Sequence, residues 1–384
     1  MLNKRQSTQS FSFFSIFVVR NGNKTDYVKR TLIMHLCSRQ RFQALLLFIL
    51  LMLCTTSGVQ AKGLQRWEVL PTTHVVIVSG GMNKLMNQER YWNDCSFLYR
   101  TLLYDYHFQK ENIMLLISDG GEPGDDQLRS DGGGFTSSSP DLDGDGERDV
   151  FLAATMETLS TTLNSLSSKL TVDDHIFLFL IDHGGSDDKQ TSSYLWLWNS
   201  EKLYDTKLAE LLSQFNVGSM NIVAGQCYSG GFIDDLAELD KQGSLRGGCI
   251  VTTACQGNEL SWMCLDKPYD EFIYHWICAI AGHDEQGNAI NADSNADGYV
   301  TMDEAFGYAY IHDRRDETPQ YRSMPYDLGQ RWTFYGMLPS ADDGIVETLS
   351  AKTVPDTYNL TGQRVSPKTK GIIIQQHKII INRR

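Results

Sequence analysis

From His74 to Ala281 the chain alternates short apolar runs with longer amphipathic segments, and this alternation constrains the fold more than any other feature. The apolar runs are rich in β-branched and aromatic residues, as strands buried on both faces of a sheet are. The segments between them have the length and periodicity of helices. The pattern predicts a doubly wound α/β fold, in which a mainly parallel sheet is flanked by helices.

The same patterns place the individual elements. We expect strands at residues 74–79, 113–118, 176–181, 221–224 and 249–253. We expect helices near residues 93–106, 153–170, 204–215 and 269–281. Residues 119–149 are rich in Gly, Ser and Asp and show no periodicity, so this segment is expected to be a functional or metal-bearing loop.

The N-terminal part has the features of an export signal. Within residues 34–61, Arg39 and Arg41 form a basic start, residues 44–54 an apolar run, and residues 59–61 a small-residue exit. The apolar run is too short to span a bilayer stably. We therefore expect residues 1–61 to be a leader and the mature chain to be periplasmic, at the cell surface or extracellular.

Charge and cysteine content restrict the partners and the redox chemistry. The leader has eight Lys/Arg and one Asp, so its removal takes the formal charge from −13 to −20. This acidic balance disfavours nucleic acid as a partner. The six cysteines beyond the leader have the spacing of neither a zinc site nor a dense disulfide scaffold, so buried free thiols are expected.

The chain changes character after about Pro339. Residues 340–384 are expected to be a linker and a small C-terminal β tail, formed by residues 358–365 and 371–381. This end resembles the short C-terminal segment of many exported Bacteroidetes proteins, and a plain terminal hairpin is the alternative.

Two predicted strands lead into residues that can carry out covalent chemistry. The strand at 176–181 leads into His183, and the strand at 221–224 leads into Cys227. Parallel strands end at the edge of the sheet where open α/β proteins bind ligands, so we expect both side chains to face one cleft. An imidazole beside a thiol favours the thiolate and later protonates a leaving amine. The amides of Gly184 and Cys227 are candidates for an oxyanion hole, which can contribute about 3 kcal/mol per donor.

Residues 67–283 resemble a legumain-type cysteine peptidase and, more distantly, caspases and gingipains. The strand ending at His183-Gly184, the helix after it and the strand ending at Cys227-Tyr228-Ser229-Gly230 carry the resemblance, together with Asn93-Asp94. It implies a caspase-hemoglobinase-like fold for a peptidase domain at 62–339. It also implies a thioester intermediate, a protein or peptide substrate, and no cofactor in the chemical step.

The resemblance also implies where the substrate binds. The implied substrate-binding residues are Arg90, Asp94, Ser229, Asn258, Glu259 and Ser261. Arg90 matches a pocket arginine of the family, whereas Tyr91 stands where the family has histidine. Legumains that cleave after Asn carry an acid two positions before the nucleophile, where this chain has Gly225, so the P1 preference stays open. Glu259 is a candidate for selecting a basic P1 residue, and an exposed loop glutamate is the alternative.

Residues 293–304 fit the twelve-residue EF-hand loop. The candidate ligands are Asp293, Asn295, Asp297, Tyr299, Thr301 and Glu304. Oxygen ligands fall at positions 1, 3, 5 and 12, and Gly298 makes the turn at position 6. Because hard sites with many oxygens suit Ca²⁺, we expect a structural calcium site followed by a helix at 305–313.

Residues 141–152 repeat part of this pattern. The candidate ligands are Asp141, Asp143, Asp145, Glu147 and Asp149. Position 12 is Leu152, so a closing ligand would have to come from elsewhere in the fold. Both loops are expected to stiffen the chain on binding Ca²⁺ and to take no part in bond cleavage.

Two other functions stay open at this point. A transamidase or amidase would use the same thioester, because the sequence does not separate water from an amine as the acyl acceptor. A non-catalytic, calcium-stabilised binding or surface protein would need the fold and not the reactive pair. The presence of both His183 and Cys227 with their glycines argues against this last function.

Overall fold

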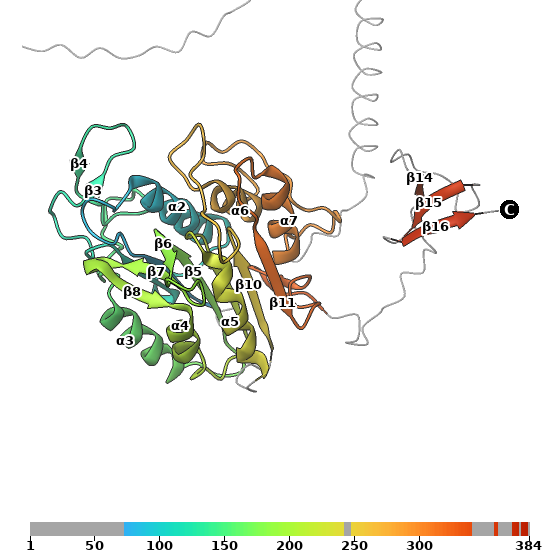
Figure 1. Ribbon diagram of the computed structural model, residues 1–384, viewed down its shortest axis with the longest axis horizontal. Helices are drawn as coiled ribbons and strands as arrows, with labels where there is room; N and C mark the ends of the chain where they lie inside the picture. The colour runs from blue at the N-terminus through green and yellow to red at the C-terminus, as the bar shows by residue number, and fades with distance from the viewer. Residues whose placement is uncertain (1–72, 242–246, 340–356, 360–370, 376–377, 383–384) are drawn as a thin grey trace, which may run out of the picture. The chain divides into compact units, whose positions relative to one another are not determined.

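The computed structural model describes residues 73–241, 247–339, 357–359, 371–375 and 378–382, so the predicted leader and linker lie outside the described residues. A six-stranded sheet in the order β11-β10-β9-β5-β1-β2 forms its centre (Figure 1). Its parallel strands are β1 (Thr73–Ser79), β2 (Ile113–Ile117), β5 (His175–Ile181), β9 (Ser219–Ala224) and β10 (Cys249–Thr253). The predicted mainly parallel sheet is therefore confirmed. An unpredicted strand, β11 (Gln320–Met324), adds an antiparallel edge beside β10.

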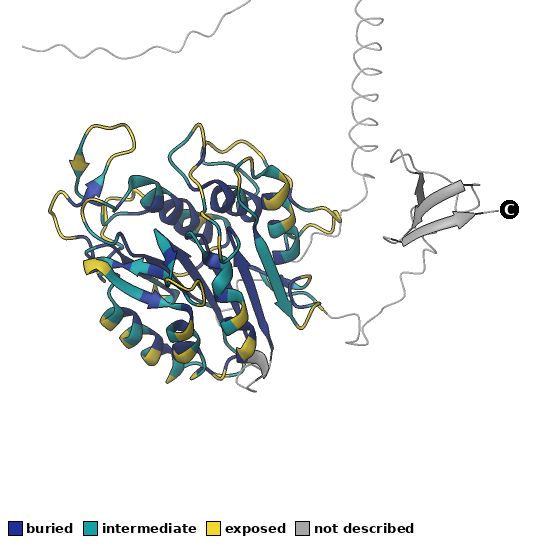
Figure 2. Ribbon diagram, viewed as in Figure 1, coloured by how far each residue is buried: buried dark blue, intermediate teal, exposed yellow. Residues whose placement is uncertain are grey.

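Helices cover both faces of this sheet (Figure 1). The helices on one face are α2 (Glu89–Arg100), α6 (Glu271–Ala281) and α7 (Met302–His312). Those on the other are α3 (Met156–Ser167), α4 (Asp205–Leu212) and α5 (Phe232–Lys241). Alternate residues of β5 serve the two cores: Phe177 and Phe179 face the first, Leu178 and Leu180 the second. The parallel strands of the central sheet are almost entirely buried, β11 at its edge is half-buried, and the outer helix faces are exposed (Figure 2).

Local signals explain several helix boundaries. The Thr155 side chain caps α3 by accepting from the Thr158 amide, and Gly282, at φ 73°, ends α6 in a left-handed conformation. The first helix begins four residues before the predicted position, at Glu89, and continues into a π-helical turn at Thr101–Asp105. Within the described part of the chain, no helix combines the length and apolarity needed to cross a membrane.

Several short strands were not predicted. A hairpin of β3 (Gln127–Leu128) and β4 (Phe135–Thr136) lies in the segment expected to be irregular. A three-stranded sheet of β6 (Gly184–Ser186), β7 (Ser193–Leu197) and β8 (Glu201–Tyr204) follows β5. Another small hairpin pairs β12 (Trp332–Thr333) with β13 (Gly336–Met337). These strands are too short or too polar for apolar periodicity to reveal them.

The C-terminal β tail has the predicted character. Strands β14 (Thr357–Asn359), β15 (Gly371–Gln375) and β16 (Lys378–Asn382) form an antiparallel sheet in that order. Residues 360–370, which include part of the first predicted tail strand, lie outside the described residues.

Candidate active site

His183 and Cys227 leave the sheet at the same edge. Strands β5 and β9 are parallel neighbours, with Leu180 opposite Ala224 and a 2.8 Å hydrogen bond from the Gly225 amide to the Leu180 carbonyl. The backbones remain in contact beyond the sheet, since a Cβ added to Gly184 would lie 2.1 Å from the Cys227 carbonyl oxygen. The prediction that these two strands are neighbours is confirmed, and Gly184 lies directly against the Cys227 backbone.

The Cys227 thiol is held by one neighbouring residue. Its Sγ lies 3.6 Å from the carbonyl oxygen of Ser261 and 3.7 Å from the Ser261 hydroxyl, which donates to it. Burial raises the pKa of the Cys227 thiol, and the two hydrogen bonds with Ser261 oppose that shift. All six cysteines of the described chain are free; five are buried, and Cys227 alone is partly exposed. The free thiols agree with the prediction.

The His183 imidazole is held neutral. Burial and, to a smaller extent, the nearby Arg90 guanidinium lower its pKa to about 4. The ring meets the edge of Tyr91 at a centroid distance of 5.3 Å, and its Nε2 lies 3.4 Å from Nε2 of Gln88. A neutral imidazole has a free nitrogen that can accept a proton, and a pKa this low makes it a weak base in the free protein.

Asp182, which was not singled out from the sequence, fixes the loop that carries His183. Its Oδ1 accepts from the His183 amide at 2.7 Å, and its Oδ2 accepts from the Gly81 amide and, at 3.4 Å, from the Ser79 hydroxyl. Burial raises the pKa of Asp182 to about 7, and the amide hydrogen bonds oppose this shift. The sequence does carry a signal for Asp182, since it is a charged residue placed directly after the apolar strand that ends at Ile181.

A buried polar cluster lies beside the two reactive side chains. The Arg90 Nε donates to Asp270 Oδ1 at 3.0 Å, and Arg90 Nη2 donates to the Tyr91 hydroxyl at 2.5 Å. The Asp270 amide donates to Asp94 Oδ2 at 3.2 Å. Both Arg90 and Asp270 act electrostatically on Cys227. The structure therefore brings the predicted Arg90 and Asp94 together and adds Asp270 to them.

The two carboxyl groups of this cluster differ in their surroundings. Burial raises the pKa of Asp94 well above its ordinary range, and the neighbouring Asp270 adds to this shift. Burial also raises the pKa of Asp270, and the Arg90 guanidinium, which bonds to it directly, opposes this shift. Asp270 is 4% exposed, and its Oδ2 has no hydrogen-bond partner among the described residues. Asp94 Oδ1 is likewise buried without a partner among the described residues, so the cluster has two such carboxyl oxygens.

Packing explains why Gly225 replaces an acid in this chain. A Cβ added there would lie 2.4 Å from Ile181 Cδ1 and 2.6 Å from Ile273 Cγ1. Any side chain would collide with these apolar groups, and a carboxylate would also be desolvated. Asp270 is the acid that lies near Cys227 instead.

The implied substrate-binding residues that follow β10, together with Ser229, differ in their contacts. Glu259 does not point freely into solvent: its carboxylate accepts from the Thr318 amide at 2.9 Å and from the Thr318 hydroxyl at 3.0 Å. Ser229 is fully buried and accepts from the Cys255 amide at 3.2 Å. Asn258 is exposed. Of Asn258, Glu259 and Ser261, only Ser261 has a hydrogen bond with Cys227 in the described part of the chain.

The loop at 293–304 has the backbone arrangement expected of a cation-binding loop. Asp293 accepts from the amides of Asp297 and Gly298 at 3.2 and 2.8 Å, and Gly298 has a φ of 93°. Glu304 accepts from the Thr301 amide and hydroxyl at 3.0 and 2.9 Å, in a capping box for α7. The carboxylates of Asp293 and Glu304 thus bond to the loop backbone, and Glu304 also begins the helix that follows. That helix starts at Met302, three residues before the predicted position.

The remaining candidate ligands of this loop are near the same turn. Asn295 Oδ1 accepts from the Asp297 amide at 2.8 Å, and Asp297 Oδ1 accepts from the Tyr299 amide at 2.9 Å. Their side-chain oxygens are therefore directed at the loop backbone.

The loop at 141–149 gathers its acids more tightly. Carboxylate oxygens of Asp141, Asp143 and Asp149 lie within 4.8 Å of one another, and within the described ranges this is the one such group of potential metal ligands. Lys110 meets this group: its Nζ lies 3.1 Å from Asp143 and 2.9 Å from Asp149. Asp145 also binds Lys110, at 2.9 Å, so a lysine ammonium supplies positive charge to this loop. Glu147 is exposed.

Comparison with known proteins gives one family. Residues 152–302 match the Peptidase C13 family. The C13 match includes both His183 and Cys227 and begins after Arg90 and Asp94, and it supports a cysteine peptidase of legumain type. No curated protein sequence matches the chain significantly.

The chain is also similar to a solved structure, that of protein GSU0716 from Geobacter sulfurreducens. The two are 12% identical, with a TM-score of 0.41, and the alignment covers 70% of this chain and 100% of that chain.

Proposed function

We propose that this protein is an exported cysteine endopeptidase in which Cys227 is the nucleophile and His183 the acid/base. The observation that carries the proposal is the position of these two residues, at the ends of adjacent parallel strands within the segment that matches the C13 family. Their backbones lie against each other at Gly184, and the Cys227 thiol is partly exposed. A signal-like sequence before the domain supports export.

In the proposed reaction the neutral His183 accepts the proton of the Cys227 thiol as the sulfur attacks the scissile carbonyl carbon. The Cys227 amide, which donates to no group among the described residues, stabilises the oxyanion that forms. The His183 imidazolium then protonates the leaving amine, and the peptide C–N bond breaks to give a thioester. Water, deprotonated by His183, hydrolyses the thioester and restores the thiol.

The cluster beside Cys227 favours a neutral amide side chain at P1. Arg90 and Asp270 neutralise each other at 3.0 Å, so a charged substrate residue would meet one repulsive partner. A carboxamide offers a carbonyl to Arg90 and an N–H to the unpartnered Oδ2 of Asp270. We therefore propose cleavage after Asn or Gln, with the acceptor role taken by Asp270.

A panel of short peptides tests this function. With P1 set to Asn, Gln, Asp, Lys or Leu, the enzyme is expected to cleave after Asn or Gln and to lose this activity in Cys227→Ala. Adding an amine to the assay distinguishes a peptidase from a transamidase, since a transamidase would give a ligated product in place of the free acid. Cleavage that is equally fast after Lys and Asn would contradict the P1 assignment.

Calcium is proposed as a structural ion of this enzyme. The loop at 293–304 supports this with its 1, 3, 5 and 12 oxygen pattern and its turn at Gly298. The loop at 141–149 supports it with three converging carboxylates. Export would bring both loops into an environment rich in calcium, where the ion would neutralise their clustered charge.

A further inference from the structure

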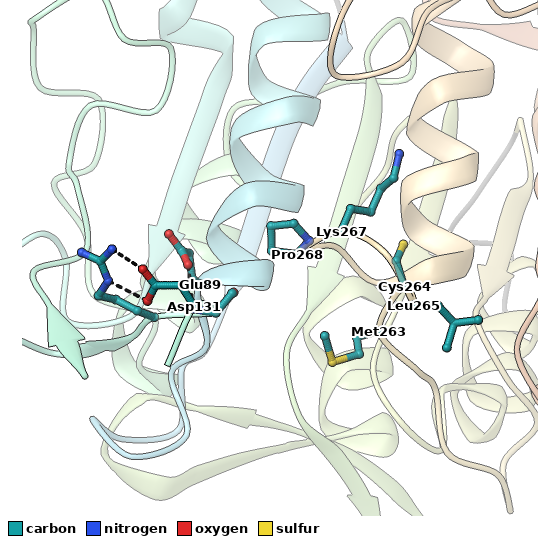
Figure 3. Close-up of a pocket in the computed structure, with 9 residues that line it drawn as sticks. Glu89, Asp131, Met263, Cys264, Leu265, Lys267 and Pro268 are labelled. Atoms are coloured by element: carbon teal, nitrogen blue, oxygen red, sulfur yellow. Dashed lines mark hydrogen bonds and ion pairs between the residues drawn. The ribbon is translucent and has the colours of Figure 1, made fainter. Parts of the chain in front are cut away.

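A cavity of about 410 Å³ lies beside the candidate active site, between the start of α2 and the segment 263–268 (Figure 3). Its lining residues are Glu89, Arg129, Ser130, Asp131, Met263, Cys264, Leu265, Lys267 and Pro268. In Figure 3, Glu89 and Asp131 stand on the α2 side, and Met263 and Pro268 on the segment across from them. The volume is in the range of cavities that hold small ligands or single side chains.

Both walls of this cavity continue from residues of the candidate active site. Glu89 directly precedes Arg90, and Pro268 stands two residues before Asp270. Met263 stands two residues after Ser261, which touches the Cys227 thiol. An extended peptide advances about 3.3–3.6 Å per residue. A peptide with its scissile carbonyl at Cys227 therefore reaches the cavity within about two to four residues of the bond that is cleaved.

Three of the four charged groups that line the cavity are in ion pairs. Arg129 pairs with Asp131 at 2.5 Å, and Lys267 pairs with Glu285 at 3.2 Å. Glu89 accepts from the Ser130 amide at 2.8 Å. A charged ligand would gain little from the two ion pairs, because their charges already have close partners. Glu89 is bonded to a neutral amide and is the one charge of the lining that a cation could still meet.

The opposite wall is apolar and exposed. Met263 is 43% and Leu265 68% exposed, and the neighbouring Leu260 and Trp262 are also among the exposed large apolar side chains. Such apolar side chains gathered on one short segment beside a reactive centre are typical of a binding surface. An apolar group placed here would bury them from water.

We propose that this cavity is a second substrate subsite, which takes a bulky apolar side chain of the peptide two to four residues from the scissile bond. The proposal rests on the peptidase function given above. It makes Met263 a specificity-determining residue that acts on the choice of sequence and takes no part in bond cleavage.

Peptides that vary at one position at a time test the subsite. Each carries the preferred P1 residue and has Leu, Phe, Ser or Asp at one other position from P4 to P4′. At one of these positions, kcat/KM is expected to be about tenfold higher for Leu or Phe than for Ser. Met263→Ser is expected to abolish most of that preference while leaving the cleavage of a one-residue P1 amide unchanged. Ile311→Ser, at an exposed apolar position on α7, serves as the control and should retain the preference.

Two results would overturn the subsite. One is a wild-type enzyme that is indifferent to apolar residues at every position, and the other is a preference that Met263→Ser leaves intact. In both of these cases the P1 amide is still cleaved, so the proposed peptidase function stands. If neither the P1 amide nor any longer peptide is cleaved, the proposed peptidase function is wrong, and the subsite proposal that rests on it is wrong too.

Discussion

At the residue scale, the candidate site combines a thiol and an imidazole that are both uncharged in the free protein. Burial raises the pKa of Cys227 and lowers that of His183 to about 4. A preformed thiolate and imidazolium pair would require shifts in the opposite directions. Proton transfer is therefore expected to accompany attack on the substrate, in the manner of general base catalysis.

This electrostatic state predicts how alkylation of Cys227 depends on pH. The imidazole stays neutral down to about pH 4, and the thiol ionises only above its ordinary pKa, so the rate with iodoacetamide should rise continuously through neutral to alkaline pH. Mass-mapped alkylation kinetics would measure it, with Cys227→Ala giving the background from the five buried cysteines. A fast plateau between pH 5 and 7 would show a preformed thiolate and contradict this description.

The close approach at Gly184 gives a second prediction. In Gly184→Ala the new methyl group would lie 2.1 Å from the Cys227 carbonyl oxygen and 2.7 Å from Gln226 Cγ, so the loop carrying the nucleophile must move. We expect kcat/KM to fall at least about 100-fold, since small displacements of reacting groups have effects of that size. Gly124→Ala is the matched control, because a Cβ there meets nothing within 4 Å. Equal activity in the two variants would show that the contact does not matter.

At the scale of elements, a segment after α7 holds the loop that contacts the nucleophile. Thr318 binds the Glu259 carboxylate, and the Trp262 amide donates to Glu317 at 3.1 Å. The Glu259 carbonyl in turn accepts from the Tyr228 amide, next to Cys227, at 2.8 Å. Residues 313–318 therefore support Ser261 from both sides. These contacts favour a positioning role for Glu259, and its predicted role in selecting a basic P1 side chain stays a prediction.

Loosening this support should slow the reaction. Thr318→Val removes the hydrogen bond from the hydroxyl to Glu259 and keeps the one from the backbone amide, so the Glu259 carboxylate is held less firmly. We expect kcat to fall roughly tenfold, while KM for a P1 amide changes little. Glu259→Gln should act in the same direction, because the amide can accept only part of the hydrogen bonds. Glu111→Gln, at an exposed site, is the control. A change confined to KM would place Glu259 in substrate binding after all.

At the scale of the whole molecule, the sequence predicted what depends on local pattern. The apolar runs located the five parallel strands, and chain order placed His183 and Cys227 at neighbouring strand ends. Contacts between residues far apart in the sequence could not be predicted, because they leave no local pattern. Asp270 precedes an apolar helix and has the position of an ordinary helix cap, yet it pairs with Arg90, 180 residues away. The approach of Lys110 to the acidic loop at 141–149 is likewise a tertiary contact without a local signal.

Calcium removal should lower the stability of the whole domain. An ion present at about 100 times its Kd adds about 2.7 kcal/mol to the unfolding free energy. For a domain of this size this corresponds to a fall in Tm of roughly 5–10 °C on adding EDTA. Lys110 competes with a cation for Asp143 and Asp149, so Asp293→Ala is expected to reduce the EDTA effect more than Asp141→Ala. Identical melting curves with and without EDTA would remove calcium from this account.

The central claim is that Cys227 forms a covalent bond to the acyl group of the substrate. The most direct measurement is mass spectrometry of the intact protein and its peptides after reaction with a peptidyl acyloxymethyl ketone, which traps catalytic thiols. We predict one adduct, located on Cys227, absent from Cys227→Ala and formed much more slowly by His183→Ala. An adduct on another residue, or labelling that persists in Cys227→Ala, would contradict the assignment of the active site.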